Sequence, residues 1–102
     1  MNREEDIMKL IQQMCDDDRE EEVVRMIDDL PDEERTYKIV GLQARTLSNL
    51  AGMIRSGYTE SELNPDDLDR RALSILADTA EDGKDDPNWW CRNGYTRMGL
   101  NM

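Results

Sequence analysis

Apolar side chains recur at steps of three and four residues between residues 37 and 54, and this periodicity constrains the fold more than any other feature. The recurring positions are Tyr37, Val40, Gly41, Ala44, Leu47, Leu50, Ala51 and Ile54. Such spacing places them on one face of a helix. Pro31 and the three acids after it suit a first helical turn, and Gly57 can adopt the left-handed conformation that ends a helix. The pattern predicts one long helix from Pro31 to Ile54.

Residues 1–30 predict two shorter helices. The first begins at Asn2, whose side chain can cap the first turn. The run Asp16-Asp17-Asp18 favours side-chain to backbone hydrogen bonds and predicts a turn between the two helices. The apolar stripes are Ile7, Leu10, Ile11 and Met14 in the first helix, and Val23, Met26, Ile27 and Leu30 in the second. Because the connection is short, we expect an antiparallel helical hairpin.

Two proline motifs predict helices in the second half of the chain. In Asn64-Pro65 and in Asp86-Pro87, a capping residue precedes a proline suited to the first helical position. The first of these helices would face inward with Leu68, Ala72, Ile75, Leu76 and Thr79. No segment alternates long enough to form a strand. The predicted fold is all-α: one domain over residues 1–102, with about five helices packed as antiparallel pairs and residues 1–30 as a hairpin.

Charge and composition exclude several classes of function. The chain has 24 acidic and 13 basic side chains and a net charge of −11, so phosphate backbones and anionic membranes should repel it. Histidine is absent, which removes the commonest general base, and no glycine-rich phosphate loop is present. The acidic run over residues 16–22 lacks the central glycine of a calcium loop. We therefore expect no enzyme, catalytic residue, cofactor or metal, and no nucleic-acid or membrane partner.

The location and the cysteines follow from similar arguments. The acidic start of the chain lacks the apolar core of a secretion signal, and no apolar run could span a bilayer, which predicts a cytoplasmic protein. Cys15 and Cys91 stand far apart without a second cysteine near either. We interpret both as buried thiols, with a disulfide or a reactive thiol as the alternative.

Three side chains leave more than one interpretation open. Trp89 and Trp90 are adjacent, so on a helix they point about 100° apart. One can lie in the core, and the other then tends to lie at an edge. We interpret both as packing the last helix against the other helices, with one of them as an interface anchor for a partner as the alternative. Arg45 falls in residues 37–58, which carry three basic side chains and no acidic one. It could form an internal ion pair with acids of a neighbouring helix, or recognise an acidic peptide end.

Two segments of the second half resemble tetratricopeptide repeats. The pattern Ala72-Leu73, Leu76 and Ala80 before Asp86-Pro87 resembles the second helix of such a repeat. The run Gly83-Lys84-Asp85-Asp86-Pro87-Asn88-Trp89, followed by Arg92-Asn93-Gly94-Tyr95, is similar to a bacterial tetratricopeptide-like group. That group carries an upstream segment like Leu42-x-Ala44-Arg45-x-Leu47-x-Asn49-Leu50, which this chain also has.

The chain departs from the tetratricopeptide pattern in three places. Asn93 replaces an apolar residue, the loop over residues 56–63 is long for the turn inside a repeat, and the sequence stops at Met102 before a partner helix would follow. A repeat needs neighbours to bury its apolar face. We expect the last helix to fold back onto the helices over residues 37–54 and 65–80. Dimerisation through this helix is the alternative.

The resemblance implies a non-catalytic protein–protein interaction module that binds a peptide or helix of a partner protein in a groove. The expected partner-binding residues are Tyr37, Arg45, Asn49, Trp89 and Trp90. The acidic charge supports an alternative, an inhibitor or immunity-type protein that blocks a basic surface by charge mimicry. A third interpretation is an N-terminal fragment of a longer repeat protein.

Overall fold

The structure is a computed structural model that describes residues 3–101, and in this range it is helical throughout, with no strand. The elements are α1 (Arg3–Asp16), α2 (Glu20–Asp28), the 3-10 helix η1 (Asp32–Glu34), α3 (Tyr37–Arg55), α4 (Pro65–Asp78), α5 (Ala80–Gly83) and α6 (Pro87–Gly99). The all-α prediction is confirmed. The described residues form six α-helices rather than about five, because Thr79 interrupts the fourth predicted helix and α5 follows as a separate turn. The predicted cap at Asn2 lies outside the described residues.

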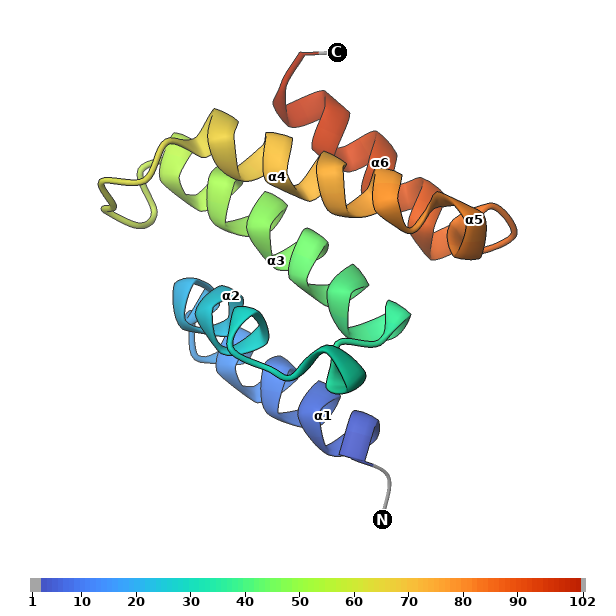
Figure 1. Cartoon of the computed structure of the whole chain (residues 1–102). Helices are drawn as coiled ribbons and strands as arrows, with labels where there is room; N and C mark the ends of the chain where they lie inside the picture. The colour runs from blue at the N-terminus through green and yellow to red at the C-terminus, as the bar shows by residue number, and fades with distance from the viewer. Residues whose placement is uncertain (1–2, 102) are drawn as a thin grey trace.

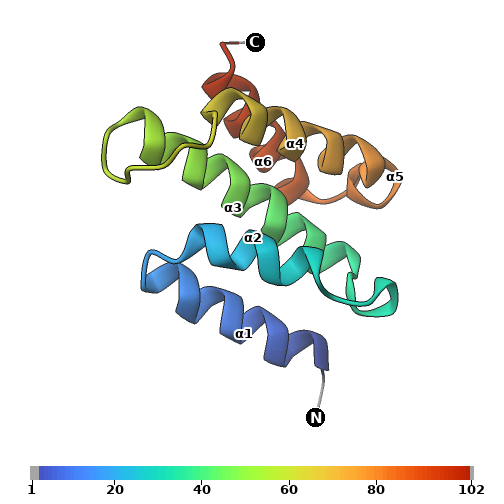
Figure 2. The ribbon, with the colours of Figure 1, turned by 60° about the vertical axis from the view of Figure 1, so that its left-hand side comes forward.

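Helix α3 lies in the middle of the molecule, with α1 and α2 on one side and α4 and α6 on the other (Figures 1 and 2). It contacts all four of these helices. One core cluster, between α1, α2 and α3, contains Ile7, Ile11, Met14, Val23, Ile27 and Ile39. The other, which joins α2, α3, α4 and α6, contains Val24, Ala44, Leu47, Ala72, Leu76 and Trp89. Because α3 is covered on several sides, it also buries Ile39, Gln43, Thr46 and Ser48, which lie outside the predicted apolar face.

The start of α3 differs from the prediction. Pro31 opens the short helix η1, which is closed by hydrogen bonds from the Glu34 N–H to the Pro31 carbonyl (2.9 Å) and from the Arg35 N–H to the Asp32 carbonyl (3.2 Å). The Arg35 backbone then leaves the helical region, with φ −86° and ψ 69°. Helix α3 therefore begins anew at Tyr37. At its other end Gly57 has φ +78°, the left-handed conformation predicted for it.

The capping motifs behave as predicted. The Asn64 side chain accepts a hydrogen bond from the Asp66 N–H at 2.8 Å, and the Asp86 carboxylate accepts one from the Asn88 N–H at 2.9 Å. In both helices the proline occupies the first turn. These local signals fix where α4 and α6 begin.

Two positions in the first half correct the predicted stripes. Leu10 is exposed, although its spacing placed it with Ile7 and Ile11, because the main contacts of α1 are with α2 and α3 and they cover its other face. Helix α2 ends at Asp28 rather than at Leu30.

No helix within residues 3–101 is both long enough and apolar enough to cross a membrane.

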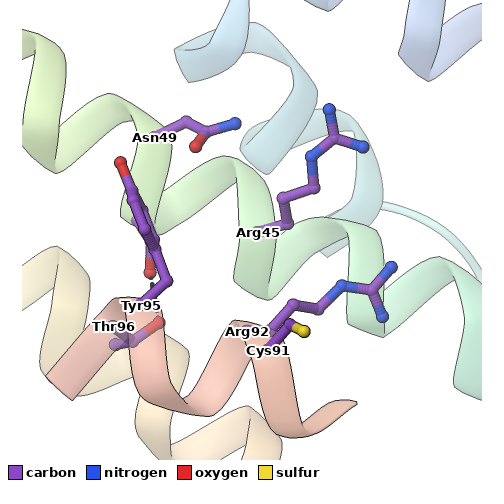
Figure 3. A pocket seen from close by; sticks show the side chains of 7 residues that line it. Arg45, Asn49, Cys91, Arg92, Tyr95 and Thr96 are labelled. Atoms are coloured by element: carbon purple, nitrogen blue, oxygen red, sulfur yellow. Dashed lines mark hydrogen bonds between the residues drawn. The ribbon is translucent and has the colours of Figure 1, made fainter. Parts of the chain in front are cut away.

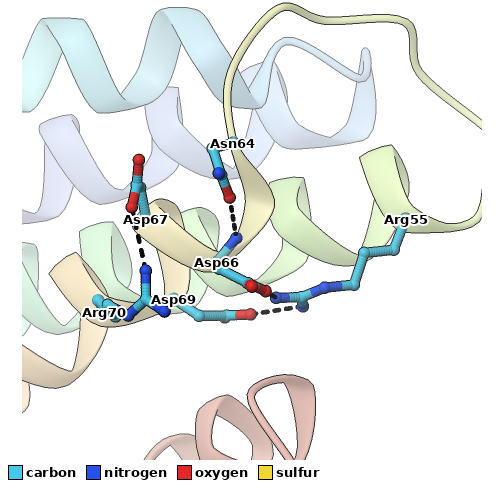
Figure 4. A network of polar contacts seen from close by, with 6 residues as sticks. All are labelled: Arg55, Asn64, Asp66, Asp67, Asp69 and Arg70. Carbon is cyan, nitrogen blue, oxygen red and sulfur yellow. Dashed lines mark hydrogen bonds and ion pairs between the residues drawn. The ribbon is translucent and has the colours of Figure 1, made fainter.

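A partly buried ion pair joins the end of α3 to the start of α4 (Figure 4). The Arg55 guanidinium lies 2.5 Å from Asp69, which is only 1% exposed, and 2.7 Å from the more exposed Asp66. Gly99 of α6 lies directly over this pair, since a Cβ built on Gly99 would come within 2.7 Å of the Asp69 carboxylate. The pair therefore fixes three helices relative to one another.

Candidate binding groove

Helix α6 folds back onto α3 and α4, as expected from the sequence. The Ser48 and Thr96 hydroxyls form a buried hydrogen bond of 2.5 Å between α3 and α6. Trp89 is buried, and its ring N–H donates to the Leu76 carbonyl (3.0 Å) and to the Thr79 hydroxyl (3.2 Å) at the end of α4. These contacts hold α6 beside α3 and so define the groove between them.

The groove is a cavity of about 230 Å³ between α3 and α6. Its lining residues are Arg45, Ser48 and Asn49 from α3, and Cys91, Arg92, Tyr95 and Thr96 from α6. Figure 3 shows the Arg45 and Arg92 side chains extending to the same side of the groove, while Asn49 and Tyr95 lie at its other end. Ser48 and Asn49 lie three and four positions after Arg45, so all three side chains lie on one face of α3.

The two arginines have no carboxylate within ion-pair distance among residues 3–101. Eight of the 13 basic side chains form such pairs within the described residues, and Arg45 and Arg92 are among the five that do not. The charge of Arg92 nevertheless helps to lower the pKa of Asp86. The predicted internal ion pair of Arg45 is therefore wrong: its side chain is exposed. Arg92 rests over Gly41, where an added Cβ would lie 2.8 Å from its Nη1.

A second, open and shallow recess of about 440 Å³ shares Asn49 and Tyr95 with the groove. This recess is lined by Glu20 from α2, by Asn49, Gly52, Met53 and Ser56, by Tyr58 from the loop after α3, and by Tyr95 from α6. Glu20 is 6% exposed, and its Oε2 has no hydrogen-bond partner among the described residues. Burial, with a smaller effect from the Asp18 carboxylate, raises the pKa of Glu20.

The predicted partner-binding residues do not all lie at one site. Arg45 and Asn49 line the groove together. Tyr37 lines an adjoining cavity with Arg92, and its hydroxyl donates to the Asp86 carboxylate at 2.6 Å. Trp89 is a core residue, whereas Trp90 is exposed and donates its ring N–H to the Lys84 carbonyl at 2.9 Å. One buried and one exposed tryptophan is the division predicted for an adjacent pair.

Burial and the acid at its hydroxyl raise the pKa of Tyr37 to about 12. The same hydrogen bond, with that from the Asn88 N–H, lowers the pKa of Asp86. Tyr37 and Asp86 therefore join the starts of α3 and α6 and set the end of the groove near Arg92.

Sequence reasoning missed Arg92, Tyr95 and Glu20. A signal existed for the first two, because Arg92 and Tyr95 are three positions apart and therefore share a face of α6. Nothing in the sequence distinguishes Glu20 from its two acidic neighbours. Its burial depends on where α2 lies against α3.

The cysteines differ from the buried thiols expected. Both are free: Cys91 is exposed at the groove and Cys15 is half-buried. The Cys15 sulfur lies 4.0 Å from the Thr46 hydroxyl oxygen, and burial raises the pKa of its thiol. Cys91 is exposed because α6 turns its Trp89 side, and not its Cys91 side, toward the core.

Comparison with protein-family models, with curated proteins and with solved structures finds no match for this chain. Within the described residues, no group of three or more cysteine or acidic side chains is arranged to hold a metal ion. The tetratricopeptide resemblance therefore depends on the motifs of the sequence alone.

Proposed function

We propose that the chain is a non-catalytic protein–protein interaction module, a short tetratricopeptide-like helical array of the cytoplasm. Its groove between α3 and α6 would take a peptide or helix of a partner protein. The observation that carries the proposal is the pair of arginines, Arg45 and Arg92, which line the groove and form no ion pair within residues 3–101 of a chain with net charge −11. Cations without an ion-pair partner beside a concave surface are suited to an acidic group of a ligand.

The chemistry of the groove limits the partner. Guanidinium groups bind carboxylates through paired N–H donors, and the Asn49 amide and the Tyr95 hydroxyl offer further hydrogen bonds. The overall negative charge repels a uniformly acidic ligand. The partner segment should therefore place one carboxylate, from a side chain or a chain end, within a neutral or basic stretch.

Selection from a displayed random-peptide library tests this function. The unmodified protein is compared with the Arg45→Glu/Arg92→Glu variant and with a matched control, Arg25→Glu/Arg70→Glu. The control makes the same change in net charge on α2 and α4, away from the groove.

We expect the selected peptides to carry a carboxylate and to bind the groove variant roughly 10-fold more weakly or worse, because charge-assisted hydrogen bonds are lost. The control variant should bind them as the unmodified protein does. Peptides that bind both variants equally would contradict the proposal.

Charge mimicry is the second candidate, and the exposed acids of residues 3–36 favour it. They include Glu5, Asp6, Asp16, Asp17, Asp18, Glu22, Asp28, Asp29, Asp32 and Glu33. A protein that blocks a basic surface with these acids should lose affinity steeply as salt rises. A groove binder that also uses apolar contacts should lose little. The dissociation constant of a selected peptide or partner, measured over a range of salt concentrations, separates the two.

A further inference from the structure

We propose that the recess around Glu20 binds a cationic side chain, lysine or arginine, of the partner segment that lies in the groove. This inference rests on the proposed function and specifies the chemistry of its ligand. The partner would then present a carboxylate to Arg45 and Arg92 and a cation to Glu20.

The first observation is the state of the Glu20 carboxylate. It is nine-tenths buried, it lines the recess, and its Oε2 has no hydrogen-bond partner within residues 3–101. Its neighbours Glu21 and Glu22 form ion pairs with Arg25 and Arg19 respectively, but Glu20 forms none in the described chain. A hydrogen bond from the Glu20 backbone N–H compensates the carboxylate in part, but burial outweighs it and the pKa is raised. A buried carboxylate needs further donors or an opposite charge. A bound cation would supply that compensation.

The second observation is the aromatic lining. Tyr58 and Tyr95 line the recess and are 67% and 52% exposed, so both rings remain accessible to a ligand. The Tyr58 hydroxyl donates to Asp18 at 2.8 Å, which fixes the ring and places a second negative charge nearby. Ammonium and guanidinium groups are attracted to the faces of aromatic rings. The Glu20 carboxylate and two tyrosine rings line this recess, and such groups together recognise a cation.

The third observation is continuity with the arginine end of the groove. Asn49 and Tyr95 line both the cavity beside Arg45 and the recess beside Glu20. A single peptide segment that follows α3 would therefore pass from one to the other. The opposite charges at the two ends would also fix the direction in which that segment binds.

The test uses n-butylammonium, a lysine side-chain analogue, as the probe in an amide-NMR titration of the whole chain. It is applied to the unmodified protein, to the Glu20→Gln and Tyr95→Leu variants, and to Glu33→Gln as a control that removes an exposed carboxylate outside the recess. Neutral n-butanol is the control ligand. Amide spectra establish first that each variant is folded. Because the probe has no carboxylate, its binding does not depend on the arginines or on the identity of a partner.

We expect saturable shifts at Gly52, Met53 and Tyr58 in the unmodified protein and in Glu33→Gln, and their loss in Glu20→Gln. Tyr95→Leu should weaken binding roughly 2- to 5-fold, the range of an exposed cation–π contact. Equal shifts with Glu20→Gln, equal shifts with n-butanol, or no saturable shift at all would overturn the inference. Peptide selection that fails while the probe binds would instead overturn the proposed groove function, so the two failures are distinguishable.

Discussion

The Trp89 ring lies against the backbone of Gly83, and this contact controls how closely α5 approaches α6. A Cβ built on Gly83 would lie 2.2 Å from two ring carbons, whereas a Cβ on Gly94 would meet nothing within 4 Å. Both glycines lie within helices, so helix propensity alone would favour alanine at either position. The surroundings of each glycine therefore decide whether alanine raises or lowers the free energy of unfolding.

We expect Gly83→Ala to lower the free energy of unfolding by about 1–3 kcal/mol, because the buried Trp89 ring must move. Gly94→Ala should raise it by about 0.5–1 kcal/mol, because alanine reduces the entropy lost on folding. Chemical denaturation followed by circular dichroism measures both values. A stabilising Gly83→Ala would show that the ring does not rest on this glycine.

The hydrogen bond from Tyr37 to Asp86 gives a pH dependence with a defined sign. The tyrosine pKa is raised to about 12, so its contribution to stability is complete below its ordinary value near 10 and is lost as the pH rises through about 12. The Asp86 pKa is lowered, so its contribution is present above the ordinary aspartate pKa and is lost as the pH falls through the lowered value.

In an alkaline titration followed by tyrosinate absorbance, one of the three tyrosines should ionise near pH 12. That component should be absent from Tyr37→Phe. The same variant should lose less stability than the unmodified protein as the pH is lowered through the acid range. A Tyr37→Phe titration that still contains the late component would assign the raised pKa to another tyrosine.

At the scale of helices, the junction of α3, α4 and α6 depends on one buried carboxylate. Asp69→Ala should lower the free energy of unfolding by about 2–4 kcal/mol, because it removes the buried partner of the half-buried Arg55. Asp66→Ala removes the exposed partner of the same arginine and should cost less than about 1 kcal/mol. Denaturation of the two variants side by side measures the difference, and equal losses would mean that burial is not what matters at this junction.

Helix boundaries could be predicted from sequence wherever one residue fixes them locally. Asn64 and Asp86 begin their helices because a side-chain oxygen reaches a backbone N–H two residues on. The helix start predicted at Pro31 is wrong, because a proline followed by acids suits a 3-10 turn as well as the first turn of a long helix. The groove could be predicted only in part. Arg45 and Asn49 share a face of α3, but the contribution of α6 and the burial of Glu20 depend on how distant helices pack.

At the scale of the whole molecule, excess negative charge is spread over a small helical protein. Acidic side chains outnumber basic ones by 24 to 13, and eight of the basic ones are already paired with acids. The remaining acids repel one another, and this repulsion opposes the compact state. Added salt should therefore stabilise this protein, whereas it would destabilise a protein held together by surface ion pairs.

We expect sodium chloride to raise the free energy of unfolding between about 0.01 M and about 1 M, over which the screening length falls from about 30 Å to about 3 Å. A variant with Glu60→Gln and Glu62→Gln carries less excess charge. Both residues are exposed, form no ion pair within the described chain and lie outside the helices, so capping and dipole effects do not confuse the comparison. The variant should be more stable at low salt and gain less from added salt. If salt instead destabilised both proteins, the exposed ion pairs would outweigh the repulsion, because screening weakens attraction and repulsion alike.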